Sequence, residues 1–516
     1  MKTLTYVVLL FGLLLPFALA QGRFGTSEFD VSEFRGLETL QSNCDIPAAS
    51  SFWCDHLSDT LTHIPVKGVD FFFDDAGEFL AVFAKLQKGR RLSTFAVDGR
   101  QNLIPIEAGV PGGAVLLNGE YLAPKEIEGR WQALGDDELI GHFTFLVGKV
   151  RVEKEIRIDN ASHTFEMVLK ASLAEAVVDA AEGNSGAREP LTIQYAFPGI
   201  ARQASPTVKI GQGTTFSLNP LSQPVADPGY VSLQNNNNNT AYAIIMRPQG
   251  REDGLAAQFL PPNIITMQKS LDPTTGSDVT IDLAVYTGPN ELVRYYQEGY
   301  DTLPGLFRPN ILGRLSIAII WILQFIHRYV GGWGLSIIVL TLLFRAFIWP
   351  LISTQTRSMY GMQKLQPEIQ KLQKKYKDDR EKLTQETMKL YREAGVNPAG
   401  GCLPVLLQMP LFIILWRVFV NFEFNEGFLW LPDLGRPDPI YIMPILYVAV
   451  MVGQSFFSAR GNPQSLRQQL LINLVFVFII LSFPAGVILY FVVSMSIQML
   501  QYWLISRNQS APAAAK

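Results

Sequence analysis

The sequence predicts a multi-domain membrane protein, in which an exported all-β sandwich domain precedes an α-helical membrane core of five spans with a cytoplasmic helical hairpin. Three observations lead to this prediction. The chain of 516 residues is polar and rich in turns in its first half, whereas apolar runs dominate from Ile311 onward. A short apolar segment, residues 6–20, begins the chain. A single arginine, Arg345, interrupts the apolar stretch 334–350.

Composition restricts the classes of function. The net charge is −3, which excludes a nucleic-acid binder that relies on global charge, so we expect no direct DNA binding. The chain has three cysteines and five histidines, which leave few candidates for metal or redox chemistry. We find no nucleophile–base constellation and no phosphate-binding glycine loop in the polar half. We therefore expect no cofactor, no metal and no enzymatic activity.

The N-terminal segment, residues 1–20, is typical of a targeting sequence. Lys2 precedes an apolar run of fifteen residues, and small residues at Ala18 and Ala20 match a signal-peptidase site. Two interpretations remain open: a cleaved signal peptide and an uncleaved membrane anchor. The length and the A-x-A ending favour cleavage. In either case the domain that follows is exported, after a linker of residues 21–59.

Cys44 and Cys54 lie in this exported linker. A compartment that permits oxidation favours a disulfide between them, which would close a small loop. A metal site with His56 and His63 is the alternative, but no second close pair of ligands supports it.

Residues 60–290 have the pattern of an all-β domain. Apolar residues alternate with charged ones at 150–158, and the same period recurs at 165–169 and 279–285. Turn sequences such as Pro111-Gly112-Gly113 separate the strands. We predict a β-sandwich here, followed by a connecting helix and linker at 291–310.

Arg345 is the only charged residue between 334 and 350. A helix rises about 1.5 Å per residue, so this residue lies roughly 15 Å from either edge of a hydrocarbon core about 30 Å thick. A guanidinium keeps its proton, and its placement at mid-bilayer costs at least about 2.5–3.5 kcal/mol. The residue either snorkels toward a helix end or lines a wet cavity inside the bilayer. Its mid-span position favours the wet cavity.

The distribution of charge predicts which helices of the membrane half span the bilayer and in which direction they run. If residues 311–330 spanned the bilayer, the arginine helix would carry the lysine-rich block 359–393 outward, whereas positive segments stay in the cytoplasm. We therefore expect 311–330 to lie in the outer interface as an amphipathic helix. The core, residues 331–507, then has an acidic outer loop at 421–439, and a cytoplasmic tail follows at 508–516. The expected spans are 334–352, 403–420, 440–457, 470–483 and 487–505.

The charged block 359–393 is predicted to form a cytoplasmic helical hairpin. Its first helix has one apolar stripe, Asp378-Asp379 interrupts it, and the second helix ends near Gly395. A solvated structural connector and a docking surface for an RNA-rich or protein partner both remain open. The stripe consists of Met362, Leu365, Ile369 and Leu372.

Polar residues in the spans follow one pattern. Thr341 precedes Arg345 by one helical turn, and the last span carries a polar stripe that Gln408 of the second span is able to join. Polar side chains in membranes often join helices, which is one interpretation. An unpaired arginine, with no acidic residue in any core span, favours a hydrated groove and weakens a proton-relay transporter. The stripe consists of Tyr490, Ser494, Gln498 and Gln501.

Four motifs occur in order in the membrane half: GGWGLSIIVLTLLFRAFIWPL, MQKLQPEIQKLQKKY, VNPAGGCLPVLLQMPLF and FPAGVILYFVVS. Through them, residues 312–507 closely resemble the YidC/Oxa family of membrane protein insertases. The exported domain resembles the large periplasmic domain of bacterial members. The resemblance implies five core helices around a groove that is open to cytoplasm and lipid but closed outside.

The resemblance also implies roles for particular residues. The family's arginine corresponds to Arg345, and a contact with the nascent chain corresponds to Thr341. The aromatic pair after the FPxG turn is Tyr490-Phe491, where relatives commonly have a second tyrosine. The A-x-A ending also differs from the uncleaved anchor of relatives with this exported domain. The implied partners are nascent membrane proteins, the ribosome, the Sec translocon and the lipid bilayer of the bacterial inner membrane.

The expected function is insertion and folding of nascent membrane proteins through a hydrated groove centred on Arg345. A polar groove lowers the cost of bringing a hydrophilic segment into the membrane, and apolar segments partition into lipid without ATP. The alternative from another class is a polytopic transporter or channel with an exported sensing domain. Ribosome binding by the hairpin, or solute flux through purified protein, separates the two.

Overall fold

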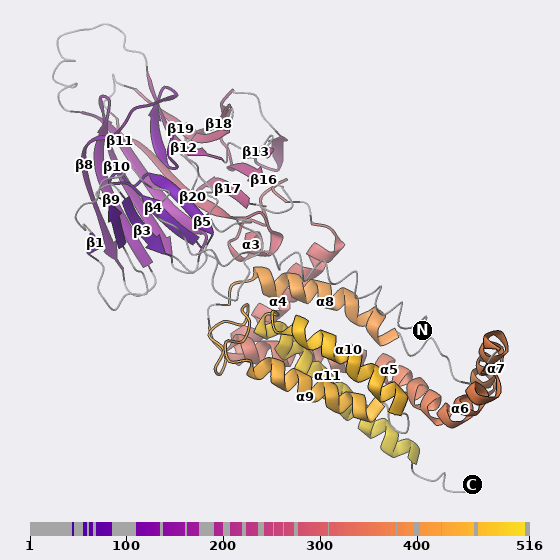
Figure 1. Ribbon diagram of the computed structural model, residues 1–516. Coiled ribbons are helices and arrows are strands. Elements are labelled where there is room, and N and C mark those ends of the chain that lie inside the picture. The colour runs from indigo at the N-terminus through magenta and orange to yellow at the C-terminus, as the bar shows by residue number, and fades with distance from the viewer. Residues whose placement is uncertain are drawn as a thin grey trace, which may run out of the picture. The chain divides into compact units, whose positions relative to one another are not determined.

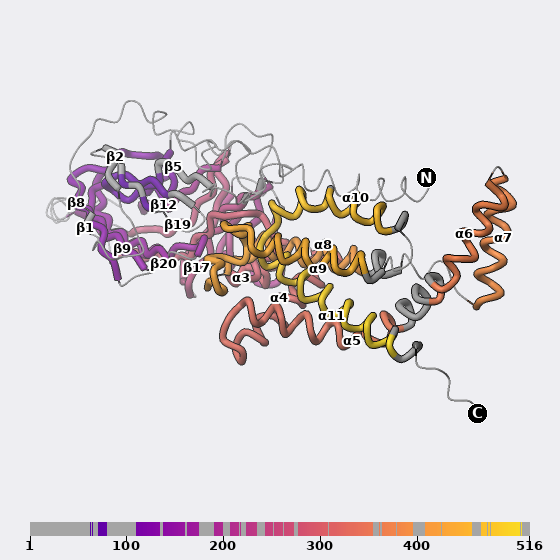
Figure 2. The backbone as a smooth tube through the Cα atoms, turned by 60° about the horizontal axis from the view of Figure 1, so that its bottom comes forward, coloured from indigo at the N-terminus to yellow at the C-terminus, as the bar shows by residue number. Residues whose placement is uncertain are grey.

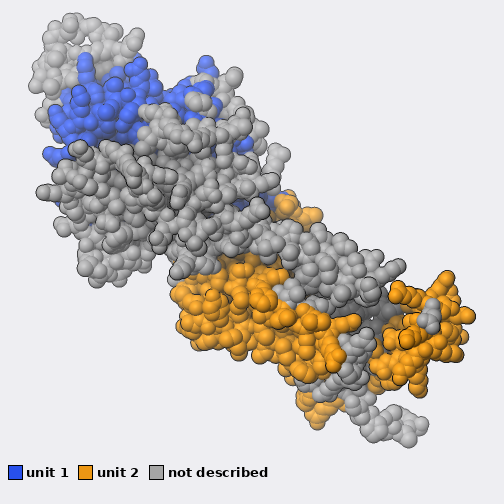
Figure 3. Space-filling view, viewed as in Figure 1, with its two compact units in different colours: residues 1–309 blue, residues 310–516 orange. Residues whose placement is uncertain are grey.

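The structure is a computed structural model that describes most of the chain. The described residues are 44–45, 55–58, 61–65, 69–84, 110–134, 138–159, 162–174, 190–199, 207–218, 223–235, 242–250, 252–261, 263–272, 277–307, 309–377, 379–395, 403–424, 426–458 and 463–510. The predicted N-terminal segment 1–20, Cys54 and the side chain of Cys44 lie outside them, so the disulfide stays a prediction. The chain divides into two compact units, Met1–Pro309 and Asn310–Lys516, which Figure 3 shows in different colours.

The described strands of the first unit form three sheets (Figure 1), in which every pair except β1–β8 is antiparallel. The ten-stranded sheet has the order β1 (Cys44–Asp45), β8 (Lys125–Ala133), β9 (Glu138–Val147), β10 (Val150–Asp159), β11 (Thr164–Leu173), β20 (Val279–Pro289), β17 (Tyr242–Pro248), β16 (Tyr230–Asn235), β13 (Thr207–Gln212), β14 (Thr215–Leu218). The six-stranded sheet has the order β15 (Val225–Ala226), β18 (Ala256–Leu260), β19 (Ile264–Leu271), β12 (Leu191–Pro198), β6 (Ala114–Leu117), β7 (Glu120–Tyr121). The four-stranded sheet consists of β2 (Asp55–Ser58), β3 (Leu61–Pro65), β4 (Val69–Phe73) and β5 (Phe79–Ala84).

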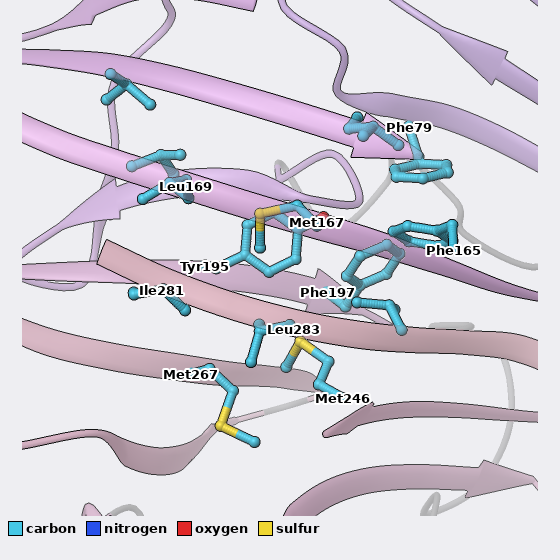
Figure 4. Close-up of a cluster of buried hydrophobic side chains, with 14 of the residues drawn as sticks. Phe79, Phe165, Met167, Leu169, Tyr195, Phe197, Met246, Met267, Ile281 and Leu283 are labelled. Carbon is cyan, nitrogen blue, oxygen red and sulfur yellow. The ribbon is translucent and has the colours of Figure 1, made fainter. Parts of the chain in front are cut away.

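The core of this unit lies where side chains of all three sheets meet. In β10 the buried and exposed residues alternate along the strand, as its sequence predicted. Aromatic rings fill one part of the core (Figure 4). The centroid of the Phe165 ring lies 4.7 Å from that of Phe79 and 6.1 Å from that of Phe197. Packing of the ten- and six-stranded sheets around these side chains makes the unit a β-sandwich, and this part of the predicted fold is confirmed.

A short helix, α3 (Leu292–Gln297), ends the first unit. The side chain of Glu298, which follows it, accepts hydrogen bonds from the Ser162 hydroxyl at 2.5 Å and from the Thr164 hydroxyl at 2.9 Å. The segment after the sandwich is therefore fixed to β11 and the turn that precedes it.

The second unit is helical. Among its described residues, three helices are long and apolar enough to cross a membrane: Ile311–Val330, the Trp333–Ser353 part of α5, and the Ala485–Ile505 part of α11. Shorter apolar stretches lie in α8, α9 and α10. The helices are α4 (Ile311–Val330), α5 (Trp333–Lys364), α6 (Gln366–Lys375), α7 (Arg380–Glu393), α8 (Leu403–Asn421), α9 (Ile442–Ser458), α10 (Pro463–Ile480) and α11 (Ala485–Ser510).

The two largest differences from the predicted ranges are at the end of α5 and the beginning of α10, and α11 also continues to Ser510, into the predicted tail 508–516. α5 continues to Lys364, so the beginning of the block 359–393 belongs to this helix. α10 begins at Pro463, seven residues before the predicted span 470–483, because proline is well suited to the first turn of a helix. Its 18 residues give a length of about 27 Å. The predicted interruption near Asp379 is present, and its side chain accepts a hydrogen bond from the Lys382 N–H at the start of α7.

Side-chain contacts give the directions of the helices. α11 contacts α5 through Ser494 with Arg345 and, further along both helices, through Gln501 with Trp349. Because the residue numbers increase in the same direction on both helices, the two helices are parallel. Figure 2 shows these helices side by side. α8 runs opposite to α11, because Gln408 bonds to Tyr490 whereas Phe419 lies against Gly486.

The loop of residues 422–441 packs over one end of this bundle. A side chain at Gly334, near the start of α5, would overlap the ring of Phe428. The N–H of Gly486, near the start of α11, donates to the Leu434 carbonyl at 2.8 Å. Asp438 accepts from the Met443 N–H at 2.7 Å, at the start of α9. This loop therefore joins the beginnings of three parallel helices.

Candidate functional site

Arg345 lies on α5 with only 7% of its surface exposed. Its Nε donates a hydrogen bond to the Ser494 hydroxyl of α11 at 2.7 Å, and its Nη2 donates to the same oxygen. Among the described residues, no carboxylate forms an ion pair with this guanidinium. The site therefore contains a buried cation whose protein partner is neutral, which leaves its charge available to a bound anionic group.

Thr341 lies one turn before Arg345 and is also buried. Its hydroxyl donates to the Ile337 carbonyl of its own helix at 2.6 Å. The structure therefore places Thr341 beside Arg345 on the same face of α5. Because its hydroxyl proton is donated to a backbone carbonyl, the hydroxyl is left to act as an acceptor.

Gln408 and Tyr490 connect α8 to the same region. The Gln408 side-chain amide donates to the Tyr490 hydroxyl at 2.8 Å. Tyr490 precedes Ser494 by one turn of α11, so the polar groups of Gln408, Tyr490, Ser494 and Arg345 form one cluster across three helices.

The remaining two candidates make no polar contact with this cluster, although the ring of Phe491 lies 5.4 Å from that of Tyr490 between their centroids. Phe491 is half-buried among aromatic rings, 5.8 Å from Phe412 and 6.0 Å from Tyr447. Gln498 is half-buried, one turn beyond Ser494, and its side chain forms no hydrogen bond with the described residues. We therefore separate these two from the polar contacts of Arg345.

Two polar contacts were missed as parts of the site. Gln501 donates to the Trp349 carbonyl at 3.1 Å and to the Ser353 hydroxyl at 2.8 Å, and its place in the polar stripe was the available signal. Asn473 of α10 donates to the Ser455 hydroxyl of α9 at 2.8 Å. In the sequence this pair was indicated only by the polar residue Asn473 within an otherwise apolar run.

A separate charged cluster, which was not predicted, lies inside the β-sandwich. Lys154 lies on the inward face of β10 and donates to the carbonyls of Gly77 at 2.6 Å and Gly113 at 2.9 Å. Burial raises the pKa of Glu78 to about 7 and that of Asp74 to about 6. Burial also lowers the pKa of Lys154 to about 8. In the described part of the chain, no three metal-ligating side chains lie close enough to hold a metal ion.

Comparisons with known proteins match the helical unit by sequence and almost the whole chain by fold. The family model described as 60Kd inner membrane protein matches residues 325–512. The membrane protein insertase YidC of Deinococcus radiodurans is 38% identical over 328 residues, which cover 62% of this chain and 74% of that protein. The YidC of Pseudomonas aeruginosa PAO1 is 36% identical over 248 residues, 47% of this chain and 43% of that protein.

A solved structure is similar across almost the full length. The crystal structure of an active YidC insertase with its first transmembrane domain resolved superposes with a TM-score of 0.54 at 19% sequence identity. The superposition covers 96% of this chain and 98% of that one. Together with the sequence relatives, it shows that the chain belongs to the YidC family of membrane protein insertases.

Proposed function

We propose that this insertase of the inner membrane works through the polar cluster centred on Arg345. The observation that carries the proposal is the bond from Arg345 to the Ser494 hydroxyl, because it leaves a buried positive charge without a described carboxylate partner. A buried cation in surroundings of low dielectric attracts an acidic side chain more strongly than it would in water. The natural substrate for such a site is the acidic, hydrophilic segment of a nascent membrane protein.

The proposed topology has five spans: α5, α8, α9, α10 and α11. Support comes from the helix directions, since α5 and α11 are parallel and α8 runs opposite to α11. α4 is then an interfacial helix, although its length and composition also suit a span. The excess of lysine near α6 supports a cytoplasmic location for α6 and α7, with the β-sandwich in the periplasm.

The proposed mechanism needs no ATP and no covalent chemistry. Polar side chains of Arg345, Ser494, Tyr490 and Gln408 hold water in a groove within the bilayer. This lowers the free energy required to bring a hydrophilic segment of the client into the membrane. Apolar segments of the same client partition sideways into lipid, which supplies the free energy for insertion.

The ribosome and the Sec translocon are proposed partners. The argument for the ribosome rests on the exposed, lysine-containing surface of α6 and α7. Nascent membrane proteins reach the Arg345 cluster from that side in the proposed topology.

The function is tested with pairs of single-span clients that differ only in the acidity of their translocated tail. Arg345→Lys keeps the charge but loses the planar fork, so substantial insertion should remain. Arg345→Ala should impair clients with acidic tails most, and Arg345→Glu should be worse for them because like charges repel in a weakly screened site. Arg328→Ala, which changes an exposed arginine of α4, is the matched control. An equal loss for acidic and neutral tails would overturn the role of charge attraction.

A further inference from the structure

Pro350 weakens the helix that carries Arg345. α5 is one helix from Trp333 to Lys364, and Pro350 lies inside it. A proline has no N–H to donate to the carbonyl four residues earlier, here Ala346, and its ring presses on that carbonyl. Kinks in helices therefore occur at such positions. This weak point separates Arg345 from the part of α5 that leads to α6 and α7.

The side-chain amide of Gln501 bonds to the turn of α5 that contains the proline. Its Nε2 donates to the carbonyl of Trp349 at 3.1 Å and to the hydroxyl of Ser353 at 2.8 Å. Trp349 directly precedes Pro350, and Ser353 follows it by three positions. Gln501 is only 1% exposed, so water is excluded from competing for these bonds. One amide of α11 thus holds the turn 349–353 of α5, which follows the missing bond to the Ala346 carbonyl.

The same helix also holds Arg345. Ser494, which accepts the bonds from Arg345, lies seven positions before Gln501, or about 10 Å along α11. α11 therefore fixes α5 at the polar cluster and, two turns further on, at the proline. Between these points the two helices run parallel, because their numbering advances in the same direction.

We propose that Gln501 is a positioning residue for insertion. Ser494 holds Arg345 before the missing hydrogen bond, and Gln501 holds Trp349 and Ser353 after it, so that α11 keeps α5 straight across Pro350. This fixes the direction in which the helix leaves the Arg345 cluster toward α6 and α7. Without the Gln501 contacts, α5 bends at Pro350, and α6 and α7 sample a wider range of positions. The inference rests on the proposed function, since it takes these two helices as the segment that delivers clients.

The test measures geometry and insertion separately, in the full chain with its cysteines replaced by serine. Spin labels are attached at Lys375→Cys in α6 and Phe456→Cys in α9, two exposed positions, and their distance distribution is measured by pulsed electron paramagnetic resonance in lipid. Gln501→Met keeps the side-chain length but removes both donors. Ser353→Ala removes only the second partner and is the milder variant. Ser496→Ala is the matched control, because that hydroxyl bonds to the Val492 carbonyl of its own helix.

We expect Gln501→Met to broaden the distance distribution and to lower insertion roughly eightfold, the loss that corresponds to two interhelical hydrogen bonds of about 0.6 kcal/mol each. Ser353→Ala should give a smaller change in the same direction, and Ser496→Ala none. In a Pro350→Ala background the helix is continuous, so Gln501→Met should leave the distribution narrow and insertion largely restored.

Two results would overturn the proposal. One is a distribution that stays native in Gln501→Met. The other is equal broadening with and without Pro350, which would show that the amide joins the two helices without supporting the proline. The distances are measured without a client. A failure of the Arg345 mechanism would therefore appear in the tail-acidity experiment and leave this result intact.

Discussion

Arg345 and Ser494 are joined by two hydrogen bonds that end on one oxygen, since both Nε and Nη2 of the guanidinium donate to the serine hydroxyl. A guanidinium has five N–H donors, so this arrangement uses two and leaves three. Arg345 forms no other hydrogen bond with the described residues. The remaining donors suit water or the two oxygens of a client carboxylate, which arginine binds in a fork.

Ser494→Ala tests this anchor. The guanidinium loses its neutral partner, and a hydrogen bond to a charged group contributes about 1.5–3 kcal/mol. We expect a lower melting temperature in detergent and a loss of insertion for clients with acidic tails. Ser496→Ala removes a hydroxyl from the same helix without breaking a contact to α5, so it should behave as wild type. Equal melting temperatures for the two variants would show that Ser494 does not hold Arg345.

Tyr490→Phe removes the hydroxyl that accepts the bond from Gln408. The amide of Gln408 then lacks its partner on α11, and we expect a loss of stability of about 0.6–1.7 kcal/mol, the range of interhelical hydrogen bonds in membranes. A double-mutant cycle with Gln408→Leu, read from unfolding in mixed micelles, isolates this term. Additive effects of the two substitutions would mean that the bond contributes nothing.

Replacing residues 366–393 by a short flexible linker removes α6 and α7. These helices border a cleft of about 510 Å³ whose lining includes Ile369, Leu383, Met388 and Tyr391, with Gln468 of α10. We expect weaker co-sedimentation with translating ribosomes and less co-translational insertion, whereas the melting temperature of the membrane core stays unchanged. Unchanged insertion would reduce the two helices to a solvated connector.

The buried Glu78 makes the stability of the β-sandwich depend on pH. Burial raises its pKa from 4.5 to about 7, beside Asp74, Lys154 and the Tyr121 hydroxyl that donates to it at 2.8 Å. The folded state therefore keeps a proton that the unfolded state has released, and the free energy of unfolding falls as pH rises from about 4.5 to 7. For one proton the slope is at most about 1.4 kcal/mol per pH unit.

Glu78→Gln should flatten this dependence, because the amide carries no titrating proton. The measurement is hydrogen–deuterium exchange of the β5 and β10 amides in the full chain, corrected for the intrinsic rate at each pH. Glu120→Gln, at an exposed position of β7, is the control and should keep the wild-type slope. The same slope in Glu78→Gln would assign the pH dependence to another group.

Local periodicity predicted the parts of the fold that depend on short stretches of sequence. The alternation in β10 and β11 fixes which residues face inward, so these strands were found from the sequence. Thr341 and Arg345 likewise share a face because they are one turn apart. The partner of Arg345 depends instead on how α11 is rotated against α5, a property of two distant segments, and so the Ser494 contact had to come from the structure.

The acidic loop is a second feature that the sequence predicted only in part. Its acidic residues were predicted to mark an external loop, which stays a prediction, and the structure adds that Asp433 and Asp438 are buried. Asp433 accepts from the Gly435 N–H at 2.7 Å, and Asp438 accepts from the Met443 N–H at 2.7 Å. Loop backbone groups that are removed from water need acceptors, and these carboxylates provide them. Charge counting alone does not distinguish such a role from solvation.

In the proposed topology, the loop over the beginnings of α5 and α11 also keeps the membrane an electrical insulator. Phe428 occupies the space beside Gly334, and the Leu434 carbonyl accepts the Gly486 N–H, so the backbones at this end are in close contact. In the proposed topology, water that reaches Arg345 from the cytoplasm meets this packing as the closed end of a blind channel. Protons and ions enter and return by the same mouth. A cell can therefore carry many copies of the protein without discharging the gradient that drives its ATP synthesis.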